Sequence, residues 1–183
     1  RELVGAGNSV IVPTPAYMPF LSVPKLYDVD VIEIEMLQSG DAETGEAQWV
    51  FDFHAIERAF AAGCHAFVLC NPHNPIGKVL TLEEELRLSD LAAQYDVRIF
   101  NDEIHAPFVF EGRHIPFPTI SEQAALQSMT ATSASKSFNI PGTKCAQVLL
   151  TNPADRDMWA VKAEWSEHQT ATIGAIATTT AYN

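Results

Sequence analysis

The sequence predicts an α/β fold, a three-layer sandwich in which helices cover both faces of a mainly parallel sheet. Two observations support this prediction. Short apolar or β-branched runs alternate with segments of helical spacing, which is typical of parallel sheets. The runs are also almost continuously apolar, which is typical of strands buried on both faces. The chain has 183 residues, of which 47% are apolar and 19% charged, so it can form one substantial core.

Six runs have the character of buried strands. In chain order they cover residues 9–12, 29–34, 66–69, 97–100, 129–132 and 146–150. Between the second and the third run, residues 35–48 are mostly polar and contain Gly40 and Gly45. We therefore expect a loop there.

Two helices are predicted from their first residues. Asp52 can accept hydrogen bonds from the first turn of a helix, whose apolar positions are then Ile56, Ala59 and Phe60. Thr81 and Glu84 match a capping box, in which each side chain bonds the backbone amide of the other residue. The acidic run at residues 83–85 is expected to face solvent. The apolar positions with helical spacing in this second helix are Leu82, Leu86, Leu88, Leu91 and Ala92.

Both ends of the chain have the pattern of helices without their usual boundary signals. Residues 1–4 resemble the end of a helix, and residues 181–183 continue a helical pattern that has no stop signal. We therefore expect residues 1–183 to be one partial domain of a longer polypeptide.

Composition argues against several classes of partner. The formal net charge of −12 at pH 7 argues against general binding to nucleic acid or an anionic membrane surface. No apolar run approaches the roughly 20 residues of a membrane span, and residues 1–3 do not lead into the apolar segment of a signal peptide. A cytoplasmic location is expected. The three cysteines lack the spacing of a zinc site and are predicted to be buried, reduced thiols: Cys64, Cys70 and Cys145.

Three polar groups follow three of the predicted strands. Asn74 comes after the strand at residues 66–69, Asp102 follows the strand at 97–100, and Lys136 follows the strand at 129–132. Ligands of such sheets bind beyond the carboxyl ends of the strands, so these groups can converge on one pocket. A carboxylate, an amide and a lysine are the groups that hold and activate a pyridoxal ring, and the lysine can form the Schiff base.

Each of these residues also has a simpler interpretation. Lys136 alone would be a surface lysine in a loop, although Ser133, Ser135 and Lys144 lie near it in the sequence and together could bind a phosphate. A Schiff-base lysine is expected to be partly buried. Asp102 alone could be a helix cap or a loop acid, and its neighbour Glu103 is predicted to be structural.

Other candidates also have alternatives. Asn74 alone could be a turn asparagine before a proline. Tyr17 could stack on a planar ring, or it could be an ordinary core aromatic. His105 lies three residues after Asp102 and can reach the same ring hydroxyl as Asn74. The histidines have no consistent metal spacing, so no metal is predicted.

Five motifs together resemble those of a known family. They are PTPAYMPF at residues 13–20, NPHNPIG at 71–77, DEIH at 102–105, SASK at 133–136 and GTKCA at 142–146. They resemble the fold-type I pyridoxal-phosphate enzymes of the class I/II aminotransferase superfamily. His73, the DEIH run and the lysine of GTKCA resemble its C–S lyase branch, the PatB/MalY-type cystathionine β-lyases, because aminotransferases more often have an arginine at the position of Lys144.

The resemblance implies roles for individual residues. Lys136 would bind the cofactor covalently, Asp102 would pair with the pyridine nitrogen, and Asn74 would bond the ring hydroxyl. Tyr17 would stack on the ring. Ser133, Ser135 and Lys144 would hold the phosphate of pyridoxal 5′-phosphate. The family's upstream phosphate loop and its C-terminal small domain have no counterpart in residues 1–183, so this piece alone is expected to be inactive.

The resemblance also implies a reaction and an assembly. A C–S lyase would carry out β-elimination on amino acids of the cystathionine or cysteine type, releasing a thiol, pyruvate and ammonia. The full-length protein would be a homodimer with its pockets at the subunit interface. Two alternatives remain open: an aminotransferase with the same site, and a non-catalytic domain of a regulator that binds pyridoxal phosphate as an effector.

Overall fold

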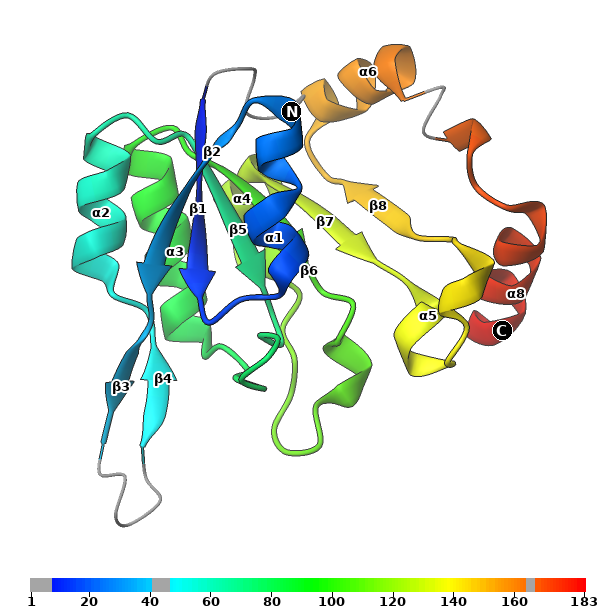
Figure 1. Ribbon diagram of the computed structural model, residues 1–183, viewed down its shortest axis with the longest axis horizontal. Coiled ribbons are helices and arrows are strands. Elements are labelled where there is room, and N and C mark those ends of the chain that lie inside the picture. Colours follow the sequence, from blue (N-terminus) through cyan, green and yellow to red (C-terminus); the bar gives the residue numbers. More distant parts are fainter. Residues whose placement is uncertain (1–7, 41–46, 164–166) are drawn as a thin grey trace.

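The computed structural model describes residues 8–40, 47–163 and 167–183. The helix end expected at residues 1–4 lies outside the described residues. A six-stranded sheet has the order β2-β1-β5-β6-β7-β8 (Figure 1). Its strands are β1 (Ser9–Thr14), β2 (Asp30–Glu35), β5 (Ala66–Cys70), β6 (Arg98–Asp102), β7 (Ser128–Thr132) and β8 (Gln147–Leu150). Neighbouring strands are parallel except β7 and β8, which confirms the mainly parallel α/β sheet.

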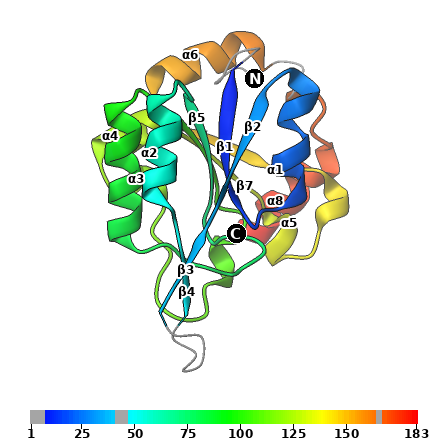
Figure 2. The same cartoon turned by 60° about the vertical axis from the view of Figure 1, so that its left-hand side comes forward.

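Helices cover both faces of this sheet, as predicted. One face carries α2 (Phe53–Ala61), α3 (Leu82–Gln94) and α4 (Glu122–Gln127), and the other carries α1 (Met18–Ser22) (Figure 2). Helices α6 (Pro153–Lys162) and α8 (Thr172–Tyr182) follow β8. Further helical turns are η1 (Pro24–Tyr27), η2 (Ala106–Phe108), η3 (Phe117–Thr119), α5 (Ala134–Ser137) and η4 (Pro141–Thr143).

Consecutive residues of β5 supply the two cores on either side of the sheet. Phe67 and Leu69 point into the larger cluster, beneath α2 and α3, whereas Ala66 and Val68 point into the smaller one, beneath α1. Because side chains alternate along a strand, only an apolar run without interruption can fill both layers. This is why the strand pattern predicted a covered sheet.

The predicted helix starts are confirmed. The Asp52 carboxylate accepts a hydrogen bond from Ala55 N at 2.9 Å. Thr81 Oγ1 accepts from Glu84 N at 3.2 Å, and Glu84 Oε2 accepts from Thr81 N at 2.9 Å, so the capping box is complete.

The predicted buried face of α3 is partly wrong. Leu82 and Leu86 are 45% and 36% exposed, whereas the buried positions are Glu85, Leu88, Ser89 and Ala92. These four are spaced at i, i+3, i+4 and i+7, which is one face of a helix. Glu85 belongs to the acidic run that was expected to face solvent, yet it is completely buried.

The loop expected at residues 35–48 is also partly wrong. Leu37–Ser39 forms β3 and pairs in antiparallel fashion with β4 (Gln48–Val50), and this ribbon extends beyond the sheet (Figure 1). The side chains of β3 are exposed. Because this pairing depends on backbone hydrogen bonds more than on apolar burial, the hydrophobic pattern contained little signal for it.

The three cysteines carry free thiols, as predicted. Cys64 and Cys70 are buried, but Cys145 is only half-buried, because it follows the exposed Lys144 at the wall of a cavity. Within the described part of the chain, no helix has both the length and the apolar character that crossing a bilayer requires.

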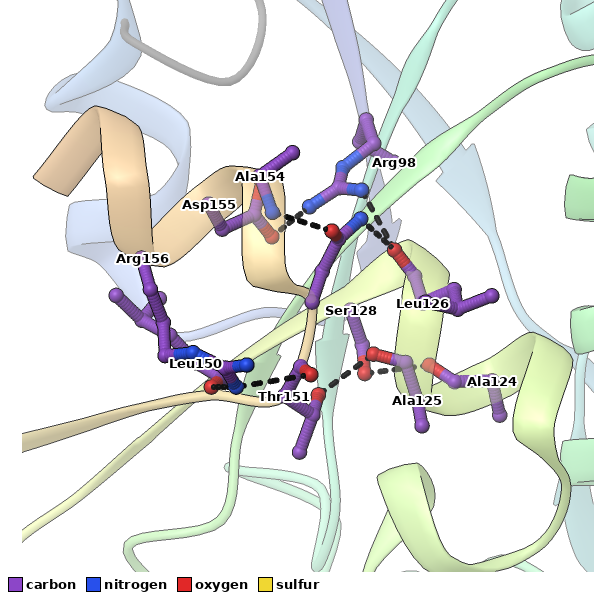
Figure 3. Close-up of polar contacts among 11 residues, drawn as sticks. Arg98, Ala124, Ala125, Leu126, Ser128, Leu150, Thr151, Ala154, Asp155 and Arg156 are labelled. Carbon is purple, nitrogen blue, oxygen red and sulfur yellow. Dashed lines mark hydrogen bonds and ion pairs between the residues drawn. The ribbon is translucent and has the colours of Figure 1, made fainter.

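The last turn of α4 is anchored to the neighbouring strands by side chains (Figure 3). Ser128 Oγ donates to Ala124 O at 2.7 Å, Thr151 Oγ1 donates to Ala125 O at 2.6 Å, and Arg98 Nη1 donates to Leu126 O at 2.7 Å. Arg98 also pairs with the Asp155 carboxylate. Carbonyl groups at the end of a helix lack partners within the helix, and these side chains supply them. This end of the sheet is therefore closed by its own hydrogen bonds.

Candidate active site

Strands β5, β6 and β7 end at the same edge of the sheet. Cys70 is paired in register with Asp102, and Asp102 is paired with Ala131. The segments that leave these three strands therefore start side by side, and they carry Asn74, Asp102 and Lys136. The structure thus brings the three segments to one edge of the sheet, and the convergence of these side chains on one pocket stays a prediction.

Asp102, the last residue of β6, has charged neighbours from two other segments. Its Oδ1 accepts a hydrogen bond from Ile104 N at 3.0 Å. Burial raises the pKa of the Asp102 carboxyl, while the Ile104 amide and the positive charges of His105 and Lys136 act in the opposite direction. The structure thus brings Asp102, His105 and Lys136 within electrostatic reach of one another.

The pKa of His105 is affected by burial and by two of the same charged groups. Burial lowers its pKa, the Asp102 carboxylate raises it, and the charge of Lys136 lowers it. Lys136, the third residue of α5, is exposed rather than partly buried. Ala134 is the α5 residue that faces the interior, and this leaves the lysine ammonium on the open side of the turn. The lysine is therefore free to reach a bound molecule.

Asn74 lies in the segment between β5 and α3 and is half-buried. It lines a cavity of about 390 Å³ together with His105, Phe108 and Phe110. Within the segment, His73 N donates to Lys78 O and Gly77 N donates to His73 O, both at 2.7 Å. These bonds form a tight turn that limits where the Asn74 amide can point.

Tyr17 follows β1, the next strand along this edge. It precedes α1, is 44% exposed, and contacts Phe20 edge-on with ring centroids 5.6 Å apart. It is therefore not an ordinary core aromatic. The imidazole Nε2 of His73 lies 2.8 Å from Pro15 O, which joins the Tyr17 segment to the Asn74 segment.

Ser133, Ser135 and Lys144 line a second cavity, of about 650 Å³. Ser133 is buried, and its hydroxyl donates to Cys145 O at 2.6 Å and accepts from Ser135 N at 3.0 Å. Lys144 is exposed and has a φ of 51°, in the left-handed region. Hydroxyl and ammonium donors suit a phosphate group, with Lys144 as the cation; Ser133 would have to turn its hydroxyl proton away from Cys145 O to take part.

The family described as Aminotransferase class I and II matches residues 3–182. The chain belongs to this family. Cystathionine beta-lyase of Corynebacterium glutamicum is 40% identical over 177 residues, which cover 97% of this chain and 45% of the lyase. Protein MalY of Escherichia coli is 32% identical over 87% of this chain and 39% of its own length. Transaminases are also related, including rat kynurenine–oxoglutarate transaminase 3 at 30% identity over 79% of this chain.

Solved structures of the same kind share the fold. Cystalysin from Treponema denticola, whose crystal structure contains pyridoxal 5′-phosphate, has a TM-score of 0.85 and 30% identity. The match covers 97% of this chain and 44% of cystalysin. The chain thus spans less than half the length of the relatives it matches. The resemblance to the class I/II aminotransferase superfamily, and to cystathionine β-lyases such as MalY, is confirmed.

Two residues of this aminotransferase-family site were not predicted from the sequence. Asn71, at the start of the Asn74 segment, donates from Nδ2 to Glu85 Oε1 at 2.6 Å. Asn71 is the first residue of the NPHNPIG motif, which by itself does not indicate this bond. The available signal for Glu85 was its spacing, because it lies three and seven residues before Leu88 and Ala92 on the same helix face. Glu103 was predicted to be structural, and its Oε1 accepts from Asn101 Nδ2 at 2.6 Å and from Phe117 N at 2.8 Å.

Proposed function

We propose that this edge of the sheet binds pyridoxal 5′-phosphate and that the full-length protein is a C–S lyase acting on amino acids of the cystathionine or cysteine type. The observation that carries the proposal is the cluster of Asp102, His105 and Lys136. His105 also lines the cavity of Asn74. A carboxylate, an imidazole and an amine thus lie together at one edge of the sheet, beside a cavity that carries the amide.

The chemistry of these groups fits the cofactor. When bound, pyridoxal phosphate supplies an aldehyde for attachment to an amine and a ring that takes up electrons from the α-carbon of an amino acid. Lys136 would supply the amine and Asp102 the negative charge opposite the ring nitrogen. Asn74 and His105 would bond the ring hydroxyl. Tyr17 would stack on the ring, and Ser133, Ser135 and Lys144 would hold the phosphate.

Two of these side chains would act during turnover. The Asp102 carboxyl has a pKa raised by burial, and a positive charge beside it would restore its ionised form. Asp102 would then keep the ring nitrogen protonated. The Lys136 amine would remove the α-proton of the substrate as a general base. Loss of a β-thiolate would complete the elimination, and hydrolysis of the released aminoacrylate by water would give pyruvate and ammonia.

An aminotransferase is the second candidate, because rat kynurenine–oxoglutarate transaminase 3 is among the relatives. Both reactions need the same Lys136 and Asp102. They differ in the fate of the substrate, since a lyase releases pyruvate from cystathionine without a keto-acid acceptor. Lys144, where aminotransferases more often have an arginine, and the 40% identity to the C. glutamicum lyase support the elimination.

We also propose that residues 1–183 form part of the large cofactor-binding domain of a longer, homodimeric protein. The support is that the C. glutamicum lyase is covered over only 45% of its length, although 97% of this chain is matched. Residues that bind the substrate carboxylate would then lie elsewhere in the longer chain.

The test is pyruvate release from cystathionine by the full-length protein, with excess pyridoxal phosphate and no keto acid. Lys136→Ala should lose turnover by about 10⁴-fold or more, since it removes both the attachment point and the base. It should also lose cofactor fixation by borohydride. The control is Lys25→Ala, which alters an exposed lysine of η1 and should leave both measurements unchanged. Fixation on another lysine would refute the assignment of Lys136, and turnover only with a keto acid would favour the aminotransferase.

A further inference from the structure

Glu85 is a buried acid that none of the proposed chemical steps uses. It lies in the first turns of α3 and is completely inaccessible to solvent. Its Oε1 accepts the hydrogen bond from Asn71 Nδ2 at 2.6 Å, and its Oε2 has no hydrogen-bond partner within the described part of the chain. The charged groups that act on it are two further acids, Glu84 and Glu103. A buried carboxyl in these surroundings is costly, so its retention needs an explanation.

The partner of Glu85 joins two parts of the candidate site. Asn71 N donates to Asp102 O at 3.0 Å, which ties the residue to the end of β6. Asn71 Oδ1 accepts from Leu80 N at 3.1 Å, which closes the segment of residues 71–80 from its first to its last residue. Asn74 lies inside this closed segment. One amide side chain thus sets both the shape of the segment and its position beside Asp102.

Only one orientation of the Asn71 amide satisfies all of these bonds. Its oxygen must face Leu80 N and its NH₂ group must face an acceptor, and Glu85 Oε1 is that acceptor. Without it, the amide would leave a buried donor unpaired, which costs as much as a lost hydrogen bond or more.

We propose that Glu85 is a positioning residue, which acts through the Asn71 amide to hold the segment carrying Asn74 against the strand end carrying Asp102. Its importance for the cofactor rests on the proposed function, because there Asn74 and Asp102 contact pyridoxal phosphate. The positioning itself concerns only groups of this chain.

The protonation state of Glu85 makes the proposal testable. Burial raises the pKa of the Glu85 carboxyl to about 8; the Asn71 amide lowers this pKa, and the charges of Glu103 and Glu84 raise it. The folded protein therefore holds this proton at neutral pH and loses it above pH 8. Ionisation then places a buried charge among two other acids, so the segment should loosen progressively as the pH rises from the ordinary pKa of 4.5 to about 8.

Three variants separate the positioning role from general damage. Glu85→Gln keeps the shape and the acceptor but cannot ionise, whereas Glu85→Ala removes the acceptor. Glu83→Gln is the matched control, since Glu83 lies in the same turn of α3 and is exposed. Hydrogen exchange of the amides of residues 71–80, without cofactor, directly measures how firmly this segment is held. The dissociation constant for pyridoxal phosphate measures its consequence.

Near pH 4.5, at the lower end of this range, we expect wild type and Glu85→Gln to exchange residues 71–80 at similar rates. At pH 9 the wild type should exchange them at least about 10-fold faster than Glu85→Gln, because the ionised carboxylate is desolvated beside two other acids only while the segment is closed and therefore favours opening. The cofactor dissociation constant should rise by a similar factor in the wild type and not in Glu85→Gln. Glu85→Ala should show the fast exchange at both pH values, and Glu83→Gln should follow the wild type.

Equal wild-type and Glu85→Gln exchange at every pH would overturn the inference. If Glu85→Ala does not fold, this comparison still decides the question, because Glu85→Gln preserves the neutral state. A wild-type protein that binds no pyridoxal phosphate would refute the proposed function, while the exchange measurement without cofactor would still test the role of Glu85.

Discussion

The two edges of the sheet both carry polar side chains, but they use them differently. At the edge where β6 and β7 begin, Arg98, Ser128 and Thr151 donate to the last carbonyls of α4 (Figure 3). At the edge where these strands end, Asp102 and Lys136 lie within electrostatic reach of one another, and Lys136 is exposed. A polar residue with internal partners stabilises the fold, and one whose charge faces other unpaired charges can bind a ligand.

Strand β6 has a polar residue of each kind within its five residues. Arg98, at its start, is bound by Leu126 O and the Asp155 carboxylate. Asp102, at its end, accepts a backbone bond from Ile104 and otherwise interacts with charges on neighbouring segments. The same strand therefore offers a direct experiment, since changes at its two ends should separate activity from stability.

Among the substitutions that compare the two edges, the largest effect is expected for Asp102→Asn. The amide has nearly the same shape and can still accept from Ile104 N, but it cannot hold a ring nitrogen in its protonated form. We expect turnover of the full-length protein to fall by at least about 10²-fold, the size typical of losing one preorganised electrostatic group. The midpoint of urea unfolding should change little. Steady-state kinetics and a urea titration measure the two quantities.

Asp96→Asn is the control for this substitution. Asp96 is exposed and has a φ of 52°, a conformation that asparagine also adopts readily. It should leave turnover and stability unchanged. Near-normal turnover in Asp102→Asn would mean that the carboxylate is not the partner of the ring. The edge where the strands end would then not bind the cofactor through Asp102.

Much of the contrast between the two edges of the sheet could be predicted from the sequence, because strand ends follow from apolar periodicity. The order of Asn74, Asp102 and Lys136 after three strands was sufficient to predict one shared edge. The helix starts at Asp52 and Thr81 were predictable as well, since capping depends on residues close together in the chain.

The incorrect predictions have a common physical cause. Which side chains are buried depends on how the helices pack against the sheet. Glu85 and Leu82 are both on α3, yet the acid is buried and the leucine is exposed. The rotation of the helix against the sheet decides this, and local sequence constrains that rotation only weakly. The exposure of Lys136 and the Asn71–Glu85 bond depend in the same way on segments far apart in the chain.

A smaller effect, on stability alone, is expected for Arg98→Ala. The change removes a donor to Leu126 O and leaves the buried Asp155 carboxylate without this partner. We expect the free energy of unfolding to fall by about 1–3 kcal/mol, with turnover per folded molecule unchanged. Urea unfolding gives the first quantity, and kinetics under conditions where the variant is folded give the second. Arg113→Ala, at an exposed arginine, is the matched control. A loss of turnover in folded Arg98→Ala would mean that the two edges are coupled.

The smallest effect is expected for Thr151→Val, which removes a single hydrogen bond from the closed edge. Thr151 Oγ1 donates to Ala125 O at 2.6 Å, and valine preserves the branched shape without the donor. Thr151 is exposed, so water can replace the hydroxyl at the carbonyl. We therefore expect a loss of about 0.5–1 kcal/mol in the free energy of unfolding and no change in cofactor affinity. Urea unfolding and a pyridoxal phosphate titration on the same preparation measure both. A loss as large as that of Arg98→Ala would show that the end of α4 depends on each bond separately. A loss near zero would show that the Arg98 pair carries most of the stability at this edge.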